Sequence, residues 1–159
     1  MKTRLTNEKV FNIVYLLKTK YPELDKFDKR FNFAVTRTLA CLQPIASDLL
    51  GARESGLSKF QEFEQKKQQI IDKYSTNGNF NSDEEKQKCQ EEVNQMVLGE
   101  YKDVLEERFK EIQIYNEILG QEVEVDIVQC KFEALPNDFN FEVLRILCKE
   151  TDEELEKII

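Results

Sequence analysis

The sequence contains no histidine and no tryptophan, and only five glycines and three prolines among 159 residues. Without histidine, the chain cannot form a Ser-His-Asp triad or a Cys-His dyad, and it lacks the usual protein ligand of zinc and iron. It also lacks the side chain whose ordinary pKa lies nearest to neutrality. These absences exclude most of the common hydrolytic and metal-dependent active sites.

Long apolar runs are also missing, although 40% of the residues are hydrophobic and 34% are charged. This balance excludes a disordered tail, a collagen-like repeat and a loop-rich disulfide scaffold. The length fits one ordinary domain, so we predict a single domain over residues 1–159. No segment approaches membrane-spanning length and the first residues lack the apolar core of a signal peptide, so we expect a cytoplasmic protein.

The four cysteines are widely spaced, at positions 41, 89, 130 and 148, and no CxxC pair occurs. A zinc ribbon or a redox motif would therefore have to be assembled from distant elements. We predict buried or half-buried reduced thiols, because free cysteine is among the most buried residue types. We expect no cofactor and no catalytic or metal-ligating residue.

Negative charge is concentrated toward the C-terminus. Residues 1–58 hold 10 basic and 6 acidic side chains (+4), residues 59–119 hold 9 and 14 (−5), and residues 120–159 hold 4 and 11 (−7). Such a surface either keeps the protein soluble or attracts a basic protein partner. It disfavours direct nucleic-acid binding. The candidate partner-binding residues are Glu122, Glu124, Asp126, Glu150, Asp152, Glu153 and Glu154.

Residues 6–43 predict two helices. Thr6 or Asn7 can cap the first, whose apolar stripe recurs at helical spacing through Val10, Ile13, Val14 and Leu17. The second begins near Asp25–Asp28 and should end or kink at Gln43–Pro44, because proline lacks the amide hydrogen and crowds the preceding turn.

Residues 44–120 predict a long antiparallel helical hairpin. Its polar turn lies at residues 75–81, and Ser82 with Glu85 forms a capping box for the second arm. Pairing about the turn would bring Phe63 near Val93. Each arm carries an apolar series spaced by seven residues: Leu49, Gly56, Phe63 and Ile70 in the first, and Leu98, Leu105, Ile112 and Leu119 in the second.

Residues 121–159 predict one strand followed by short helices. Val123, Val125 and Ile127 alternate with acidic residues, and the best partner for this strand is residues 2–5. Thr151 and Glu154 form a second capping box. The fold class is therefore mainly α, with a long antiparallel hairpin packed on two N-terminal helices, a minor β element and short C-terminal helices.

Two patterns suggest chemistry but have simpler explanations. Glu122, Glu124 and Asp126 could hold magnesium or manganese beside Lys131, yet their alternation is typical of the solvent face of a half-exposed strand. Lysine and arginine also mix with phenylalanine near the second helix, a combination that can bind single-stranded nucleic acid. Core packing explains the helical spacing of these phenylalanines better. The residues concerned are Lys26, Lys29, Arg30, Arg37, Phe27, Phe31 and Phe33.

Several motifs, taken in chain order, resemble a loose group of small uncharacterised phage and prophage proteins. They are residues 5–7 (LTN), 31–35 (FNFAV), 42–44 (LQP), the Lys/Gln/Glu-rich segment ending at Lys73–Tyr74, residues 122–127 (EVEVDI) and Leu135–Pro136. The resemblance spans nearly the whole chain and supplies no catalytic residues. It implies a viral protein that works in the host cytoplasm.

Three functions follow as hypotheses. The first is a non-enzymatic protein that binds a protein partner and inhibits a host defence or nucleic-acid-binding complex through its acidic surface. The second is a small phage structural or assembly factor that self-associates through the hairpin, and the sequence leaves monomer and homodimer open. The third, a metal-dependent nuclease, is the remotest.

Overall fold

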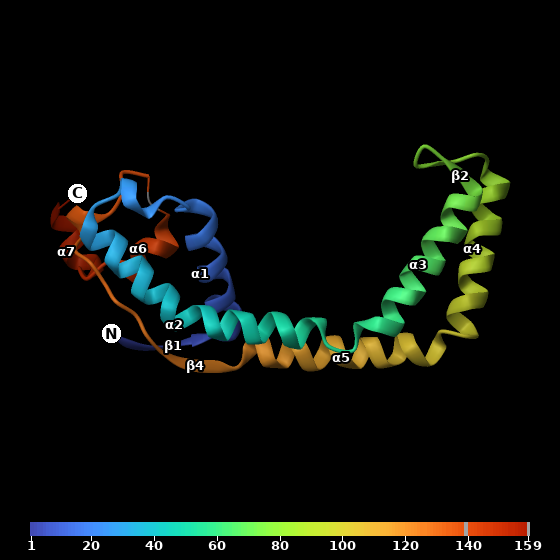
Figure 1. The fold of residues 1–159 in the computed structure, drawn as a ribbon, viewed down its shortest axis with the longest axis horizontal. Coiled ribbons are helices and arrows are strands. Elements are labelled where there is room, and N and C mark those ends of the chain that lie inside the picture. Colours follow the sequence, from blue (N-terminus) through green and yellow to red (C-terminus); the bar gives the residue numbers. More distant parts are fainter. Residues whose placement is uncertain (139, 159) are drawn as a thin grey trace. The chain divides into compact units, whose positions relative to one another are not determined.

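The computed structural model describes residues 1–138 and 140–158, without the side chains at positions 143 and 144, and confirms a mainly α fold with minor β structure (Figure 1). The α-helices are α1 (Asn7–Lys20), α2 (Lys29–Glu54), α3 (Leu57–Tyr74), α4 (Asp83–Leu98), α5 (Lys102–Gly120), α6 (Phe141–Leu147) and α7 (Asp152–Ile158). The strands are β1 (Lys2–Thr6), β2 (Ser75–Thr76), β3 (Asn79–Phe80) and β4 (Glu122–Asp126), and the 3-10 turns are Leu24–Lys26 and Phe132–Ala134.

The chain divides into two compact units within the length that we assigned to one domain. Unit 1 comprises residues 1–52 and 117–159, and unit 2 comprises residues 53–116. Unit 1 is therefore built from two segments that flank unit 2 in the sequence.

The core of unit 1 is built around α1 and α2. The Thr6 side chain caps α1 by accepting a hydrogen bond from the Lys9 amide at 3.2 Å, as the sequence predicts. The predicted apolar stripe of α1 is buried in this core. Its largest fully buried side chains include Leu17, Phe31, Leu42, Ile127 and Leu147.

The sequence predicted that a helix ends or kinks at Gln43–Pro44; it does not end there, because α2 continues through Pro44 to Glu54. Proline removes one backbone donor, but its fixed φ is compatible with a helix. Leu42, Ala46 and Leu49 are buried on both sides of Pro44. Burial of this continuous face therefore outweighs the lost hydrogen bond.

Two of the three phenylalanines in the predicted basic–aromatic segment belong to the core. Phe27 and Phe31 pack edge-to-face with Tyr21 and with each other, with ring centroids 5.1–5.7 Å apart. This confirms the core interpretation for Phe27 and Phe31. Phe33 differs, since 60% of it is exposed to solvent.

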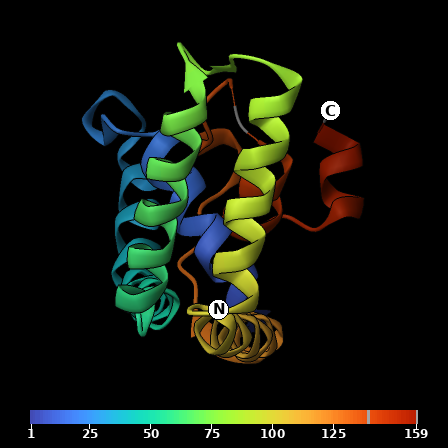
Figure 2. The same cartoon turned by 90° about the vertical axis from the view of Figure 1, so that its right-hand side faces the viewer.

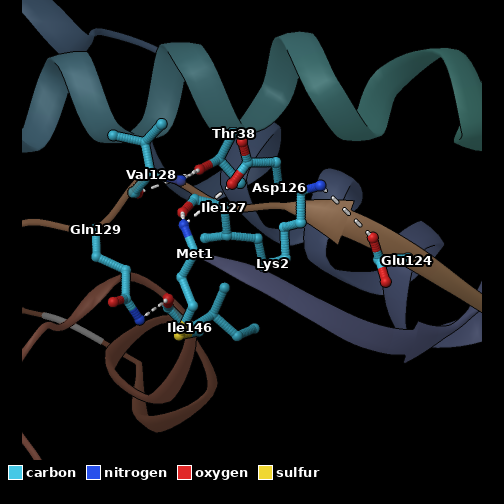
Figure 3. A network of polar contacts seen from close by, with 9 residues as sticks. All are labelled: Met1, Lys2, Thr38, Glu124, Asp126, Ile127, Val128, Gln129 and Ile146. Carbon is cyan, nitrogen blue, oxygen red and sulfur yellow. Dashed lines mark hydrogen bonds and ion pairs between the residues drawn. The ribbon is translucent and has the colours of Figure 1, made fainter.

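The β1–β4 pair joins the two segments of unit 1 (Figure 1). The strands are antiparallel, with Lys2 opposite Asp126 and Thr6 opposite Glu122, which confirms the partner predicted for the acidic strand. Beyond β4, Thr38 of α2 holds the chain at Val128. The Thr38 hydroxyl accepts from the Val128 amide and donates to the Val128 carbonyl oxygen, both at 3.3 Å (Figure 3).

Unit 2 contains the expected antiparallel helix pair, formed by α3 and α4 (Figure 2). The turn between them pairs β2 with β3, and Asn77 and Gly78 both have positive φ. Ser82 accepts from the Glu85 amide at 3.2 Å, which confirms this N-cap. The ring of Phe63, which the sequence places near Val93, packs against the ring of Tyr101 at a centroid distance of 5.4 Å.

The arms of the predicted hairpin are interrupted by two breaks. Gly56, with φ of 74°, precedes α3, and residues 99–101 separate α4 from α5. In the second arm the predicted heptad series is not a buried seam, because Leu98 and Ile112 are exposed. The break at Gly99 also separates Leu98 from the three later members, so the four residues do not belong to one continuous helix.

Candidate partner-binding site

The acidic row of β4 is balanced by positive charge on the opposite strand. Glu122, Glu124 and Asp126 are exposed, while Val125 between them is buried. The α-amino group of Met1 lies 3.0 Å from Asp126 Oδ1, and Lys2 Nζ lies 3.9 Å from Glu124 Oε1 (Figure 3). The strand pairing thus places Lys2 beside the acidic row. Two of these three carboxylates therefore already have cationic neighbours.

The same geometry does not favour a metal site on β4. Side chains at alternate strand positions are about 7 Å apart, too far for three monodentate carboxylates to converge on one ion. In the part of the chain that the structure describes, no group of three or more Cys, Asp and Glu side chains could hold a metal ion. The nuclease hypothesis gains no support from this arrangement.

Glu150 is a structural residue at the junction of two segments of unit 1. Its Oε2 accepts from the Phe132 amide at 2.8 Å and from the Cys148 thiol at 3.2 Å. Desolvation raises the pKa of Glu150, but the hydrogen bonds from Cys148 and Phe132 outweigh it and leave the pKa below its ordinary value. Glu150 is therefore engaged with its own chain.

The thiols next to this junction are buried, as predicted. Cys130 and Cys148 are free thiols whose backbones form an isolated parallel β-bridge. In this β-bridge the Cys130 amide donates to the Leu147 carbonyl oxygen at 2.8 Å. Burial, and then the hydrogen bond to Glu150, raise the pKa of Cys148 to about 11. Burial also raises the pKa of Cys130. Both groups are protonated thiols at neutral pH, so neither is an activated nucleophile.

The first turn of α7 contains the remaining predicted carboxylates. The Thr151 amide donates to Glu154 Oε2 at 2.8 Å, and the Glu154 amide donates to Thr151 Oγ1 at 3.3 Å, which confirms this capping box. Asp152 and Glu153 are exposed. Within the described residues, no hydrogen bond or ion pair engages their side chains. Of the seven candidates, these two are the most available to a partner, together with Glu122.

An open groove of about 900 Å³ lies against α7 and brings Glu150 and Asp152 together. It does not include the carboxylates of β4. Sequence reasoning missed Glu156, which belongs to the same acidic run as Glu150 and Asp152, and Phe141, which is 75% exposed and had no distinguishing sequence signal. The groove is lined by these four residues and by Met1, Gln129, Arg145, Cys148, Lys149, Thr151 and Leu155.

The lining of this groove is asymmetric in charge. Asp152 and Glu156 come from α7, while Arg145 comes from α6 and Lys149 from the segment that joins the two helices. The α7 wall is therefore acidic, whereas the other side carries Arg145 and Lys149 together with Glu150. Such an arrangement can recognise a charged peptide segment. The thiol in the lining, Cys148, donates to Glu150, and its raised pKa keeps it protonated at neutral pH.

Two further findings bear on function. None of the helices in the described ranges is both long enough and apolar enough to cross a bilayer. No protein-family model, curated protein or solved structure matches the chain.

Proposed function

We propose that this chain is a non-enzymatic binding protein whose groove at α7 takes a basic segment of a protein partner. The observation that carries the proposal is the 900 Å³ groove, because it combines an acidic α7 wall with the apolar surface of Phe141 and Leu155. Exposed aromatic anchors and complementary charge are recurrent features of protein recognition sites. The phage resemblance suggests a host defence or nucleic-acid-binding complex as the source of the partner.

The contribution of each carboxylate differs according to its existing contacts. Glu150 and Glu154 already accept hydrogen bonds from the backbone of unit 1. Asp152 and Glu156 line the groove and are exposed. The recognition charges are therefore Asp152 and Glu156, whereas replacing Glu150 or Glu154 would also disturb the fold.

A fluorescent octapeptide of alternating lysine and leucine tests this proposal by fluorescence anisotropy at 50 and 300 mM salt. The Asp152→Lys, Glu156→Lys double variant should weaken peptide affinity at least about tenfold at low salt, and added salt should reduce the difference. The matched control is Glu91→Lys, Glu106→Lys, which changes net charge equally at exposed positions of unit 2. Equal loss in both variants, or none in either, would refute a specific site at α7.

The second candidate is self-association through α5. Phe109 and Ile112 are both exposed and lie one helical turn apart, so they share one face of the helix. Charges of both signs surround them, including Glu106 and Lys110, and such a mixture is complementary to an antiparallel copy of itself. Light scattering over a hundredfold concentration range should show a dimer that Phe109→Lys abolishes; a monomer throughout that range would refute self-association.

A further inference from the structure

We infer that unit 1 carries a site for a nucleoside phosphate in the cavity between the start of α2 and the segment after β4. The cavity is an open depression of the surface with a volume of about 540 Å³, enough to hold a small molecule. Its lining contains four cations and no carboxylate, on a chain whose net charge is −8. It is lined by Lys29, Arg30, Phe33, Val128, Gln129, Cys130, Lys131 and Lys149.

The β-bridge between Cys130 and Cys148 brings two of these cations close together. The Lys149 amide donates to the Cys130 carbonyl oxygen at 2.9 Å. Lys131 and Lys149 directly follow the two bridged residues, so they are neighbours on the paired segments. Like charges at neighbouring positions of paired strands are destabilising unless a counter-charge compensates them. The fold thus holds two lysines together at the edge of one cavity.

The lysines of this cavity are not neutralised by ion pairs. Within the described ranges, no ion pair joins Lys29, Lys131 or Lys149 to a carboxylate. Glu150 is not part of the cavity lining, and its Oε2 accepts from the Phe132 amide and the Cys148 thiol. It is close enough to Lys131 to offset part of the charge of that lysine. Lys29 and Lys149 are therefore the cations most available to an anion, with Lys131 beside them.

Arg30 has a different role, because it is already paired. Its guanidinium lies 3.0 Å from Asp28 Oδ2 and 2.7 Å from Glu133 Oε1. These contacts fix the start of α2 against the turn that begins at Phe132. They thereby position the lysines that flank the cavity, Lys29 and Lys131.

Phe33 supplies a stacking surface beside the cations. It lies four residues after Lys29 and three after Arg30, so all three share one face of α2. Its ring is exposed, unlike the rings of Phe27 and Phe31, which pack in the core. An exposed aromatic beside lysines binds a ligand that combines a planar base with phosphate groups, since stacking and charge then act together.

The extent of the positive patch favours a single nucleotide over a nucleic-acid strand. Beyond these residues, the C-terminal region is strongly acidic, and Asp152 and Glu153 are exposed there. A strand would carry phosphates onto that surface, where like charge repels them. A nucleoside diphosphate places its charge on the lysines only.

Isothermal titration calorimetry with ADP and with inorganic pyrophosphate, at 150 mM salt, tests the site. The parent protein should bind both, and Lys131→Gln, Lys149→Gln should weaken both at least about tenfold. Phe33→Leu should weaken ADP about fivefold or more and leave pyrophosphate unchanged. The matched control, Lys9→Gln, Lys18→Gln, removes two exposed lysines of α1 and should bind ADP like the parent.

Four results would overturn the inference: no heat with 5 mM ADP, equal loss in the lysine variant and its control, ADP affinity that is unaffected in Phe33→Leu, or tighter binding of a ten-nucleotide oligo-dT than of ADP. The last result would identify a single-stranded nucleic-acid site instead. An amide NMR spectrum of each variant, compared with that of the parent protein, distinguishes loss of the site from loss of the fold.

Discussion

Unit 2 is more helical than unit 1 but buries fewer apolar side chains. Unit 1 has a continuous core that includes Leu17, Phe31, Leu42 and Ile127. In unit 2, all of whose residues are described, only Phe63, Cys89 and Tyr101 are buried. Helix content and core size are therefore independent properties in this chain.

The contacts of unit 2 show what replaces a core. Arg108 lies over the ring of Phe60 and Lys66 over that of Tyr101, at 5.2 and 5.0 Å from the ring centroids. Lys66 also pairs with Glu100 at 3.2 Å. Cation–π contacts and ion pairs of this kind contribute less each than the burial of a large apolar side chain. We therefore expect unit 2 to open locally at a lower free energy than unit 1.

The largest effect should come from removing a core ring in each unit. Phe31→Ala should cost about 3–5 kcal/mol of unfolding free energy, because Phe31 is fully buried against two other rings. Phe63→Ala should cost about 3 kcal/mol or less, because few buried side chains surround Phe63 and they can relax into the space that its ring leaves. Urea denaturation measures both. Phe33→Ala, in the same helix as Phe31, should stay within about 0.5 kcal/mol; equal costs for Phe31 and Phe63 would contradict the difference between the units.

The next effect concerns the two hydrogen bonds between the Thr38 hydroxyl of α2 and the backbone of Val128, after β4. Thr38→Val keeps the shape but leaves the amide and carbonyl oxygen of Val128 without the hydroxyl, at a cost of about 1–3 kcal/mol. Thr38→Ser keeps the hydroxyl and loses about 0.8 kcal/mol for the buried methyl. Hydrogen exchange of the Val128 amide should accelerate in the valine variant only. Equal exchange in the two variants would show that the Thr38 hydroxyl does not protect this amide.

A pair of glycine substitutions should have opposite signs. Gly56→Ala should destabilise unit 2 by about 1–2 kcal/mol, because φ is 74° and the new Cβ would meet the Glu111 carboxylate. Gly51→Ala should stabilise α2 by about 0.5–1 kcal/mol, because Gly51 is helical with open space around its Cα. Thermal unfolding of the two variants compares them directly. The same sign for both would show that backbone conformation is not the controlling factor.

The smallest effects are electrostatic and depend on pH. Hydrogen bonds from Tyr74 and Lys73 lower the pKa of Glu92 in unit 2, and hydrogen bonds from Arg30 lower the pKa of Asp28 in unit 1 to about 2. Each folded carboxyl therefore releases its proton more readily than the unfolded one. The resulting stabilisation is complete above the ordinary pKa values of 4.5 and 3.8, and is lost as the pH falls through the lowered values.

Carboxyl NMR titration of the folded protein measures these pKa values. Glu92→Gln should remove the acid dependence of hydrogen exchange in unit 2 and leave unit 1 unchanged, and Asp28→Asn should do the reverse. A Glu92 titration at or above pH 4.5 would show that the contact with Tyr74 does not persist in solution.

Local sequence signals predicted the parts of the fold that depend on neighbouring residues. The capping residues Thr6, Ser82 and Thr151 all accept the expected amide hydrogen bonds. The alternation in β4 also predicted its exposed face and its partner β1. These features are governed by backbone hydrogen bonds, which a few adjacent side chains determine.

Features that depend on packing were not predictable in the same way. Pro44 was expected to end or kink a helix; the helix continues, and its neighbours Leu42 and Ala46 are buried. The ring of Phe63 in α3 contacts Tyr101, which lies in the break between α4 and α5. Side chains of α3 and α4 point toward the N-terminus of their own helix, which shifts the contacts between the two antiparallel helices along their axes.

In the candidate sites too, local sequence predicted the type of surface but not the contacts of its individual side chains. The sequence identified an acidic C-terminal region, but not which carboxylates were already engaged: Glu150 and Glu154 serve the fold, whereas Asp152 lines the groove. Phe33 lies two residues after Phe31, so helical geometry places its ring on a different face of α2 from the buried ring of Phe31. Grouping the three phenylalanines as one core pattern overlooked this difference in spacing.

The discontinuity of unit 1 has a consequence for synthesis of the chain. Thr38 and its partner Val128 are 90 residues apart, and all of unit 2 is translated between α2 and β4. At about 5–20 residues per second, the apolar faces of α1 and α2 wait several seconds on the ribosome for the strand that completes their core. Unit 2 can fold during that interval from local contacts alone. The nascent N-terminal helices are thus the part of this protein most dependent on protection by chaperones.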